Sequence, residues 1–230
     1  MNQSEHIFRV LMQFAAALER ENIRYEILPV INASSDNSMS ECLRAQRENA
    51  AIRPFEEPGG GFGLAIRRGL REARGEVLCY ANSARTSAAD LTTSIRFALH
   101  NPDYVIKAVR LSYDTVFRRA GSIGFNMLCR SLFNLHCWDM NGTPKVFFRH
   151  FDRLMHLTQD DSMVDTEFNA ICQLYDYPLI ELTLAVTPRH SGRSSTNIRT
   201  AISLYSGALR FAPIFRMQHA EALARSSAHR

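Results

Sequence analysis

Hydrophobic residues return every three or four positions in one set of segments and form short unbroken runs in another. The first pattern predicts helices over residues 6–21, 64–73, 90–100, 121–133 and 168–175. The second predicts strands over residues 25–31, 76–81, 104–109 and 179–186. Strands that alternate with helices in this way are typical of an α/β fold with a mainly parallel sheet.

Two prolines interrupt these patterns. Pro29 falls inside the first predicted strand, where it removes a ladder donor, so it fits a strand that lacks a partner along one edge. Pro213 falls inside an amphipathic stretch over residues 196–217, where it would kink or end a helix. We therefore expect an α/β domain over residues 1–200 and a helical tail over residues 201–230.

Composition narrows the class of protein. The chain has 230 residues, of which 46% are hydrophobic and 22% charged, and this suits one large globular domain or two small ones. No apolar run approaches the ~20 residues that cross a bilayer, and the first six residues do not resemble a secretory signal. The five scattered cysteines are typical of a reduced, cytoplasmic protein. The net charge of +4 is too small to indicate a nucleic-acid partner.

Four short motifs, spread over about residues 24–200, follow one another in the order found in a known enzyme family. They are Gly61-x-Gly63-x-Ala65-x-x-x-Gly69, Asp139-x-x-Gly142-x-Pro144-Lys145, Asp165-x-Glu167-Phe168 and Arg189-x-x-Gly192-x-Ser194. This pattern resembles the family-2 glycosyltransferases, and among them the dolichol- and polyprenol-phosphate mannose synthases. The resemblance implies a GT-A fold, which is a Rossmann-type α/β sandwich. It also implies transfer of a sugar from a nucleotide to a polyprenyl phosphate.

The chain departs from this family at the residues that bind the nucleotide-sugar donor, which we call the donor side. Asn82-Ser83-Ala84 stands where the family has its Asp-x-Asp motif, and these side chains do not supply the carboxylate oxygens that Mg²⁺ or Mn²⁺ prefers. We therefore expect no metal bound in the usual way and no other cofactor. Of the acidic residues that the family carries after its second strand, only Asp36 remains here, and the amide Asn32 stands where the family has a carboxylate. The family's first strand is missing: another chain could supply it, the sheet could have closed without it, or the start of the chain could be misassigned.

The resemblance also implies roles for individual residues. Asp139 matches a carboxylate near the reacting centre and is the candidate general base. The candidate nucleotide-sugar ligands are Asn32, Asp36, Asn82, Arg189 and Ser194. Helical spacing and the affinity of arginine and hydroxyl groups for phosphate favour an acceptor-phosphate site at Arg118, Arg119, Ser122 and Arg130.

Structural explanations compete with these roles. Asn32 and Asp36 could cap the turn that follows the strand. The arginines could form a solvated helix face, and glycines 59–63 could be a plain loop before a helix. The tail could rest on the inner face of the membrane through its apolar side and Arg199, Arg210 and Arg216, or it could pack on the sheet or on a second subunit.

Three functions remain open. The first is a transferase that works without the usual metal, with arginines stabilising the departing diphosphate. The second is a non-catalytic relative that binds a nucleotide sugar, a lipid phosphate or a protein partner as a scaffold or regulator, and the losses on the donor side favour it. The third is an enzyme whose first strand comes from another polypeptide. A homo-oligomer is a further expected form, and a nucleic-acid partner is not expected.

Overall fold

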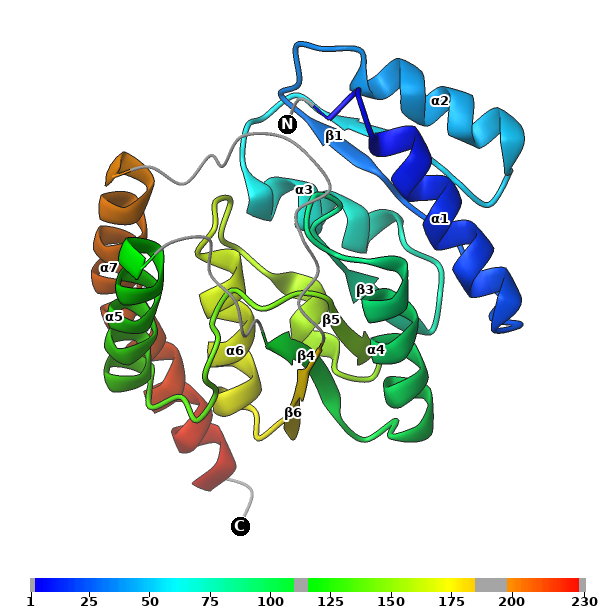
Figure 1. Cartoon of the computed structure of the whole chain (residues 1–230). Helices are drawn as coiled ribbons and strands as arrows, with labels where there is room; N and C mark the ends of the chain where they lie inside the picture. The colour runs from blue at the N-terminus through cyan, green and yellow to red at the C-terminus, as the bar shows by residue number, and fades with distance from the viewer. Residues whose placement is uncertain (1–2, 110–115, 185–197, 228–230) are drawn as a thin grey trace.

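The computed structural model describes residues 3–109, 116–184 and 198–227, and helices alternate with short strands along these ranges (Figure 1). The helices are α1 (Ile7–Arg20), α2 (Ser38–Glu48), α3 (Phe62–Glu72), α4 (Ala88–His100), α5 (Val116–Phe133), η1 (Asp152–His156, 3-10), α6 (Val164–Leu174) and α7 (Ile198–Ser227). The strands are β1 (Val30–Asn32), β2 (Phe55–Glu57), β3 (Val77–Tyr80), β4 (Val105–Val109), β5 (Lys145–Phe148) and β6 (Leu179–Thr183). The α/β fold expected from the alternating pattern is confirmed.

Strand β1 is shorter than predicted, and Pro29 explains the difference. Ile27 forms only an isolated bridge with Ile52, and regular pairing with β2 begins at Val30. The Pro29 carbonyl accepts a 2.9 Å hydrogen bond from the Phe55 N–H, so the Pro29 main chain faces β2. The missing proline N–H therefore interrupts the ladder on that side. As Pro29 suggested, β1 lacks a strand partner along one edge within the described ranges, but the missing proline donor lies on the edge that pairs with β2.

The strands form two separate sheets within the described ranges. β1 and β2 form a parallel pair. The other sheet has the order β3-β5-β4-β6, in which β5 is antiparallel to both neighbours and β6 is parallel to β4. β3, β4 and β6 therefore run in one direction, and their carboxyl ends lie at the same edge as the amino end of β5. Loops at this edge are where ligands bind in open α/β sheets.

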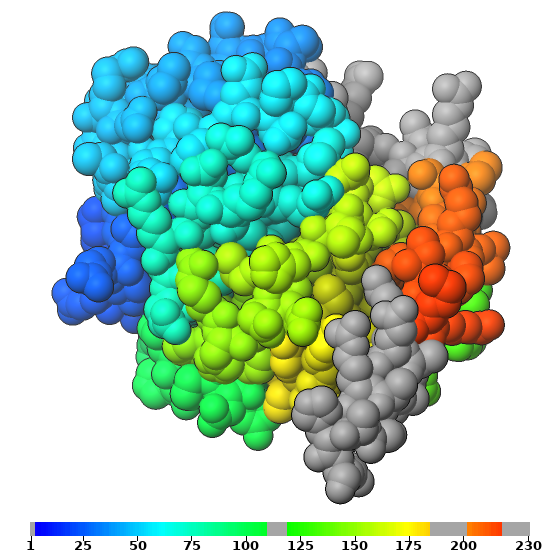
Figure 2. Space-filling view, turned by 180° about the vertical axis from the view of Figure 1, so that it is seen from behind, coloured from blue at the N-terminus to red at the C-terminus, as the bar shows by residue number. Residues whose placement is uncertain are grey.

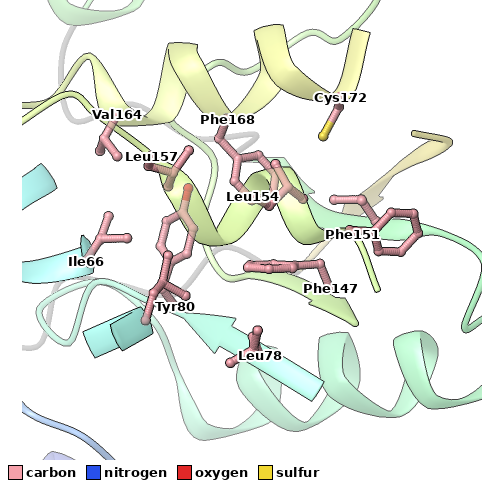
Figure 3. Close-up of a cluster of buried hydrophobic side chains, with 12 residues drawn as sticks. Ile66, Leu78, Tyr80, Phe147, Phe151, Leu154, Leu157, Val164, Phe168 and Cys172 are labelled. Carbon is pink, nitrogen blue, oxygen red and sulfur yellow. The ribbon is translucent and has the colours of Figure 1, made fainter. Parts of the chain in front are cut away.

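Helices cover both faces of the four-stranded sheet. On one face, α4 contributes Ala98 to a cluster with Ile106 and Val146. On the other face, α3, η1 and α6 enclose the main core, where the rings of Phe147 and Phe168 lie edge to face with centres 5.6 Å apart (Figure 3). Successive side chains along a strand point to opposite faces, so each strand feeds both clusters. Burial of each such aromatic side chain contributes roughly 1.5–3 kcal/mol.

α5 and α7 form a further layer outside α6. They lie side by side at one end of the molecule, and α7 packs there through Ala208, Phe211 and Phe215 (Figure 1). Seen from behind, residues 145–175 lie between α3 and α7 (Figure 2). Pro213 is exposed within α7, which continues past it. None of the described helices is both long enough and apolar enough to cross a membrane.

Candidate functional site

A row of polar side chains crosses the four-stranded sheet on the face that α6 covers. Tyr80 on β3 lies opposite Lys145 on β5, Lys145 lies opposite Lys107 on β4, and Lys107 lies opposite Glu181 on β6. Both lysines have 0% of their surface exposed. Lysine is almost never so deeply buried unless its charge is paired, so this row requires compensating groups.

Compensation comes from Glu181 and from two side chains on α6. Lys107 Nζ lies 2.9 Å from Glu181 Oε1 and donates a 3.3 Å hydrogen bond to Asn169 Oδ1. Lys145 Nζ forms an ion pair with Asp165. Asp165 and Asn169 are four positions apart, so one side of α6 directs both of them toward the sheet. Two lysines on facing positions, which would otherwise repel each other, are tolerated because each meets a carboxylate.

Burial also shifts proton affinities in the row. It lowers the pKa of Lys145; the Asp165 carboxylate opposes this shift, and the Lys107 ammonium adds to it. Burial raises the pKa of Tyr80, and the Asp165 carboxylate, which accepts a 3.0 Å hydrogen bond from the Tyr80 hydroxyl, raises it further. The Tyr80 hydroxyl therefore remains protonated, as a donor to Asp165, at neutral pH.

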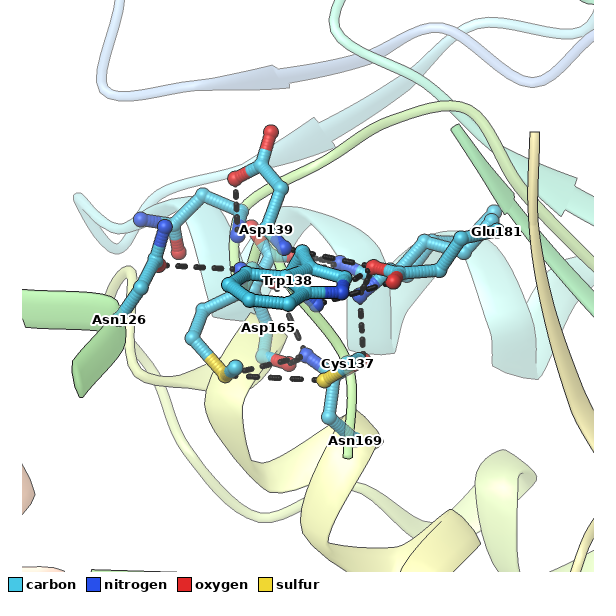
Figure 4. A network of polar contacts seen from close by, with 11 residues as sticks. Asn126, Cys137, Trp138, Asp139, Asp165, Asn169 and Glu181 are labelled. Carbon is cyan, nitrogen blue, oxygen red and sulfur yellow. Dashed lines mark hydrogen bonds and ion pairs between the residues drawn. The ribbon is translucent and has the colours of Figure 1, made fainter. Parts of the chain in front are cut away.

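The row supports a loop between α5 and β5, residues 137–141, which we call the Asp139 loop (Figure 4). Glu181 accepts hydrogen bonds from the Trp138 N–H at 2.9 Å and from the Asp139 N–H at 3.3 Å. The carboxylate that neutralises Lys107 is thus also the acceptor for the loop main chain. The position of the loop is therefore coupled to the buried charges.

The Met140 main chain fixes the other side of the loop. Its N–H donates a 3.2 Å hydrogen bond to Asn126 Oδ1 on α5. Its carbonyl accepts hydrogen bonds from Lys145 Nζ at 3.3 Å and from Asn169 Nδ2 at 3.0 Å. Groups from β5, α5 and α6 thus converge on the main chain of one residue, which orders the loop.

Asp139 itself lies at the carboxyl edge of the sheet. It is only 2% exposed, and its Oδ1 accepts a 3.2 Å hydrogen bond from the Asn141 N–H. Figure 4 shows its carboxylate directed away from the Asn169 side chain. Just after the loop, a Cβ built on Gly142 would overlap the carbonyl oxygen of Ala108 on β4. Glycine is required there because the chain passes directly against β4.

One side of α5 presents polar residues next to this loop. Arg119, Ser122, Asn126 and Arg130 are three or four positions apart and so share one helical side. The Arg130 guanidinium lies over the Trp138 ring, 4.2 Å from its centre, in a cation–π contact. Arg119 is exposed and Ser122 is half-buried. This side of α5 therefore extends from the Asp139 loop as a strip with basic and hydroxyl groups.

On the donor side, Asn32 and Asp36 are engaged with neighbouring parts of the chain. Asn32 Nδ2 donates a 2.7 Å hydrogen bond to the Gly61 carbonyl. Asp36 accepts hydrogen bonds from the Ser38 hydroxyl at 2.6 Å and from the Ser4 N–H at 2.9 Å. Burial raises the pKa of Asp36, but these hydrogen bonds outweigh it and lower the pKa to about 2. Asp36 thus caps the turn after β1, and a nucleotide contact by either residue stays a prediction.

Asn82-Ser83-Ala84 begins a turn directly after β3. Asn82 Oδ1 accepts a 3.0 Å hydrogen bond from the Ala84 N–H, and the Ser83 hydroxyl donates a 2.5 Å hydrogen bond to Gln3 Oε1. Across the described ranges, no group of three or more His, Cys, Asp or Glu side chains could hold a metal ion. The expectation that this turn binds no metal remains a prediction for experiment.

The glycine cluster before α3 packs tightly against the loop that precedes α6. A Cβ on Gly61 or Gly63 would overlap main-chain oxygens of that loop. The Leu64 N–H donates a 3.0 Å hydrogen bond to the Asp160 carbonyl, and Glu167 accepts hydrogen bonds of 2.9 Å from other N–H groups of the same loop. These glycines permit a close approach of two main chains. This contact supports the structural explanation for the cluster over a phosphate cradle.

The predicted site residues fall into three groups. Around the Asp139 loop and the adjoining side of α5 lie Asp139, Arg119, Ser122 and Arg130. At the carboxyl end of β1 or just after the ends of β1 and β3 lie Asn32, Asp36 and Asn82. Arg118 belongs to α5 but its side chain is outside the described part, and Arg189 and Ser194 are outside the described residues.

The sequence analysis assigned no site role to the buried residues that hold the loop, although some of them, such as Lys145 and Asp165, stand in the quoted motifs. The full set is Lys107, Lys145, Glu181, Asn126, Asn169 and Asp165. The available signal was a charged residue in the middle of a short apolar strand, as at Lys107 and Glu181. Such a residue on a strand covered by helices must be paired or must mark a site.

Several solved structures resemble this one. The crystal structure of glucosyl-3-phosphoglycerate synthase from Mycobacterium tuberculosis in complex with phosphoglyceric acid matches with a TM-score of 0.69 and 12% identity, covering 94% of this chain and 76% of that chain. The same synthase in complex with Mn²⁺, UDP-glucose and phosphoglyceric acid matches with a TM-score of 0.67 and 12% identity, covering 92% of this chain and 76% of that chain. A mycobacterial protein matches with a TM-score of 0.66 and 15% identity, covering 87% of this chain and 67% of that chain. No protein-family model and no curated protein matches the sequence.

Identities of 12–15% carry the architecture and not the activity. The shared feature is the α/β architecture of helices and mixed sheets. The chain therefore has the α/β fold of the GT-A glycosyltransferases.

Proposed function

We propose that this protein is glycosyltransferase-like and binds a nucleotide sugar and a phosphate-bearing acceptor at the carboxyl edge of the four-stranded sheet, without a divalent metal at Asn82. The observation that carries the proposal is the buried row beneath the Asp139 loop. Two fully buried lysines, neutralised by Glu181 and Asp165, are costly to maintain and hold one loop in place. Preorganisation of this kind is what a reacting centre requires.

On the acceptor side, Asp139 is the proposed general base. A base must approach the acceptor oxygen closely, and the loop fixes this carboxylate at the edge where ligands of α/β sheets bind. Arg130, and then Ser122 and Arg119 along the same side of α5, would bind the acceptor phosphate, with Arg118 as a further proposed ligand. Arginine is suited to this role because its planar fork matches phosphate oxygens.

On the donor side, the proposal rests on the family resemblance. Arg189 and Ser194 would contact the nucleotide diphosphate, and Asn32, Asp36 and Asn82 would line the nucleotide side. Arginine can stabilise negative charge that develops on a departing diphosphate, which is the task a metal ion performs elsewhere. Transfer in this form would proceed without Mn²⁺ or Mg²⁺.

The proposed acceptor is a lipid phosphate, presented at the inner face of the cytoplasmic membrane. Large apolar side chains on α7 remain exposed, among them Ile202 at 63%, Leu209 at 57% and Met217 at 65%. Exposed Arg210 and Arg216 lie on the same helix. Apolar side chains combined with arginines are suited to an anionic membrane surface.

Vesicle co-sedimentation tests this membrane contact. We expect binding to phosphatidylcholine vesicles only when they contain phosphatidylglycerol, and loss of binding when Arg210 and Arg216 become glutamate. The matched control is Arg71→Glu on the exposed side of α3, which should leave vesicle binding unchanged. Equal loss in the control, or binding unaffected by the α7 changes, would refute the membrane contact.

The second candidate is a non-catalytic protein of the same fold that binds its ligands as a scaffold or regulator, with a protein partner or as a homo-oligomer. Two observations favour it. The residues at the family's metal position have no carboxylate. The Asn32 and Asp36 side chains are already committed to Gly61, Ser38 and Ser4.

A transfer assay separates the two candidates. The purified chain is incubated with UDP-glucose or GDP-mannose and a polyprenyl phosphate, with EDTA or with Mn²⁺, and the lipid product is measured. Transfer in EDTA that is lost in Asp139→Asn, with polyprenyl-phosphate binding retained, supports the transferase. Binding of both ligands without transfer supports the second candidate, and failure to bind either ligand refutes both.

A further inference from the structure

Asn141, at the end of the Asp139 loop, has a side-chain amide that forms no hydrogen bond within the described ranges. Its Oδ1 is closed off from solvent without a donor in hydrogen-bonding distance, and its Nδ2 has no acceptor. The Asn141 main chain is engaged, because its N–H donates a 3.2 Å hydrogen bond to Asp139 Oδ1. Most buried polar atoms in folded proteins have a partner, so this amide calls for an explanation.

Formation of the turn does not explain the amide. The Gly142 N–H donates a 3.3 Å hydrogen bond to the Asp139 carbonyl, and the Asp139 carboxylate accepts the Asn141 N–H. Asparagine often stabilises a turn by a hydrogen bond from its side chain to the nearby main chain, but here the Asp139 side chain has that role. The turn is therefore closed without the Asn141 side chain.

Other amide side chains in the same region are engaged with the loop. Asn126 Oδ1 accepts a 3.2 Å hydrogen bond from the Met140 N–H. Asn169 accepts a hydrogen bond from Lys107 Nζ and donates one of 3.0 Å to the Met140 carbonyl. These contacts fix Met140, the residue directly before Asn141. They also show that an amide beside this loop finds a partner when its role is structural.

The unpaired amide lies beside the candidate reacting centre. Asn141 is two positions after Asp139, and a Cβ built on the next residue, Gly142, would lie 3.4 Å from Asp139 Oδ2. The Asn141 residue is half-buried, so part of its side chain reaches the surface at the carboxyl edge of the sheet. Rotation about the last side-chain bond exchanges the amide oxygen and nitrogen. A ligand at this edge can therefore meet either atom.

The chemistry of an amide selects one class of group among the proposed ligands. A neutral amide has an acceptor oxygen and a donor nitrogen, which match a hydroxyl group because a hydroxyl both donates and accepts. Phosphate oxygens act mainly as acceptors and are better matched by arginines, such as those on α5. The hexose of a nucleotide sugar carries several hydroxyl groups, and it must lie next to Asp139 if Asp139 is the base.

We propose that Asn141 binds a hydroxyl group of the hexose in the bound nucleotide sugar and thereby selects the hexose. This inference rests on the proposed function, and it applies to the transferase and to the non-catalytic candidate alike because both bind the sugar. A hexose without that hydroxyl would leave the amide unpaired and bind more weakly. Asn141 is thus a specificity residue, and proton transfer stays with Asp139.

Monodeoxy nucleotide sugars test this assignment by calorimetric titration in EDTA. Whichever of UDP-glucose and GDP-mannose binds is compared with its analogues that each lack one hexose hydroxyl. We expect one analogue to bind the wild-type protein about tenfold more weakly than the parent sugar. Asn141→Ala should bind the parent and this analogue with Kd values within about twofold of each other. The matched control is Gln13→Ala, which removes an exposed amide from α1 and should keep the wild-type pattern.

Thermal unfolding separates this role from a structural one. Asn141→Ala should unfold at the wild-type temperature or above, because it removes an amide that has no partner and leaves the turn hydrogen bonds in place. If this variant does not fold, Asn141→Gly makes the same test with a residue that is common in turns.

Two results would overturn the inference while the wild-type protein still binds a nucleotide sugar. One is equal discrimination against every analogue by the wild type and by Asn141→Ala. The other is a lower unfolding temperature of the variant with unchanged affinity. If the wild-type protein binds neither nucleotide sugar, the proposed function itself fails, and the inference fails with it.

Discussion

Replacing Glu181 by glutamine should leave the buried Lys107 ammonium without its counter-charge. The two side chains are 2.9 Å apart, where the attraction at an effective dielectric constant of about 20 is about 6 kcal/mol. Desolvation of both groups offsets most of this, and loss of one partner from a buried pair costs about 3–5 kcal/mol. The Glu181 side chain is 16% exposed, so water can partly solvate the site. We therefore expect Glu181→Gln to lower the free energy of unfolding by about 3 kcal/mol, near the lower end of that range.

Lys107→Met should lower the free energy of unfolding by less than Glu181→Gln does. The Glu181 carboxylate would still accept hydrogen bonds from the Trp138 and Asp139 N–H groups and remain partly solvated. The double variant no longer contains a buried unpaired charge. We therefore expect its loss to be smaller than the sum of the two single losses by at least about 1.5 kcal/mol, which is within the range for directly contacting residues.

Urea unfolding at neutral pH, followed by circular dichroism, measures these free energies. The control is Glu72→Gln on α3, which removes a half-buried ion pair with Arg68 at 3.1 Å and should lower the free energy of unfolding by less than about 1 kcal/mol. The account of the buried row would be refuted if Glu181→Gln cost no more than Glu72→Gln. Losses that add within about 0.5 kcal/mol would show that Lys107 and Glu181 are not coupled.

Three further outcomes follow from the site. Gly142→Ala should lower the free energy of unfolding by about 3 kcal/mol, because the added Cβ overlaps β4. Gly121→Ala should raise it by about 0.5–1 kcal/mol, because a Cβ there meets nothing within 4 Å. Equal free energies for the two variants in urea unfolding would contradict this. Asp36 has a pKa lowered from 3.8 to about 2, so its stabilising effect is complete above pH 3.8 and is lost as pH falls toward 2. The stability difference between wild type and Asp36→Ala should therefore shrink over that window, and a difference that is constant with pH refutes the capping role. Arg130→Met should weaken binding of a phosphate-bearing acceptor about tenfold, read from the fluorescence of Trp138, the single tryptophan; an unchanged affinity removes Arg130 from the site.

The sequence predicted those elements whose pattern is decided locally. α1 and α4 follow apolar residues at helical spacing, and β4 follows an apolar run. α2 was missed because only Cys42 and Ala45 bury apolar side chains in it. β2 was missed because two of its three residues are glutamates beside a proline, and pairing with β1 decides its conformation.

The candidate site, too, could be predicted from the sequence only in part. Motif positions such as Asp139 and Arg130 could be proposed from spacing and resemblance, and both lie at the Asp139 loop. The contacts beneath it could not be predicted, even where residues such as Lys145 and Asp165 stand in motifs, because the contact between Lys107 and Glu181, for example, depends on the register of β4 with β6. Strand β5 lies antiparallel between β3 and β4, which no local pattern indicates, and this placement brings Lys145 against Asp165.

Calorimetric titration with UDP-glucose and GDP-mannose, in EDTA and then in Mn²⁺, tests the central claim most directly. The claim is that this fold binds a nucleotide sugar without a divalent metal at Asn82-Ser83-Ala84, where no carboxylate is present. The account predicts saturable binding of one of the two nucleotide sugars with the same Kd in EDTA and in Mn²⁺. A Kd at least tenfold lower in Mn²⁺, abolished by Asn82→Ala, or the absence of binding under both conditions, would contradict it.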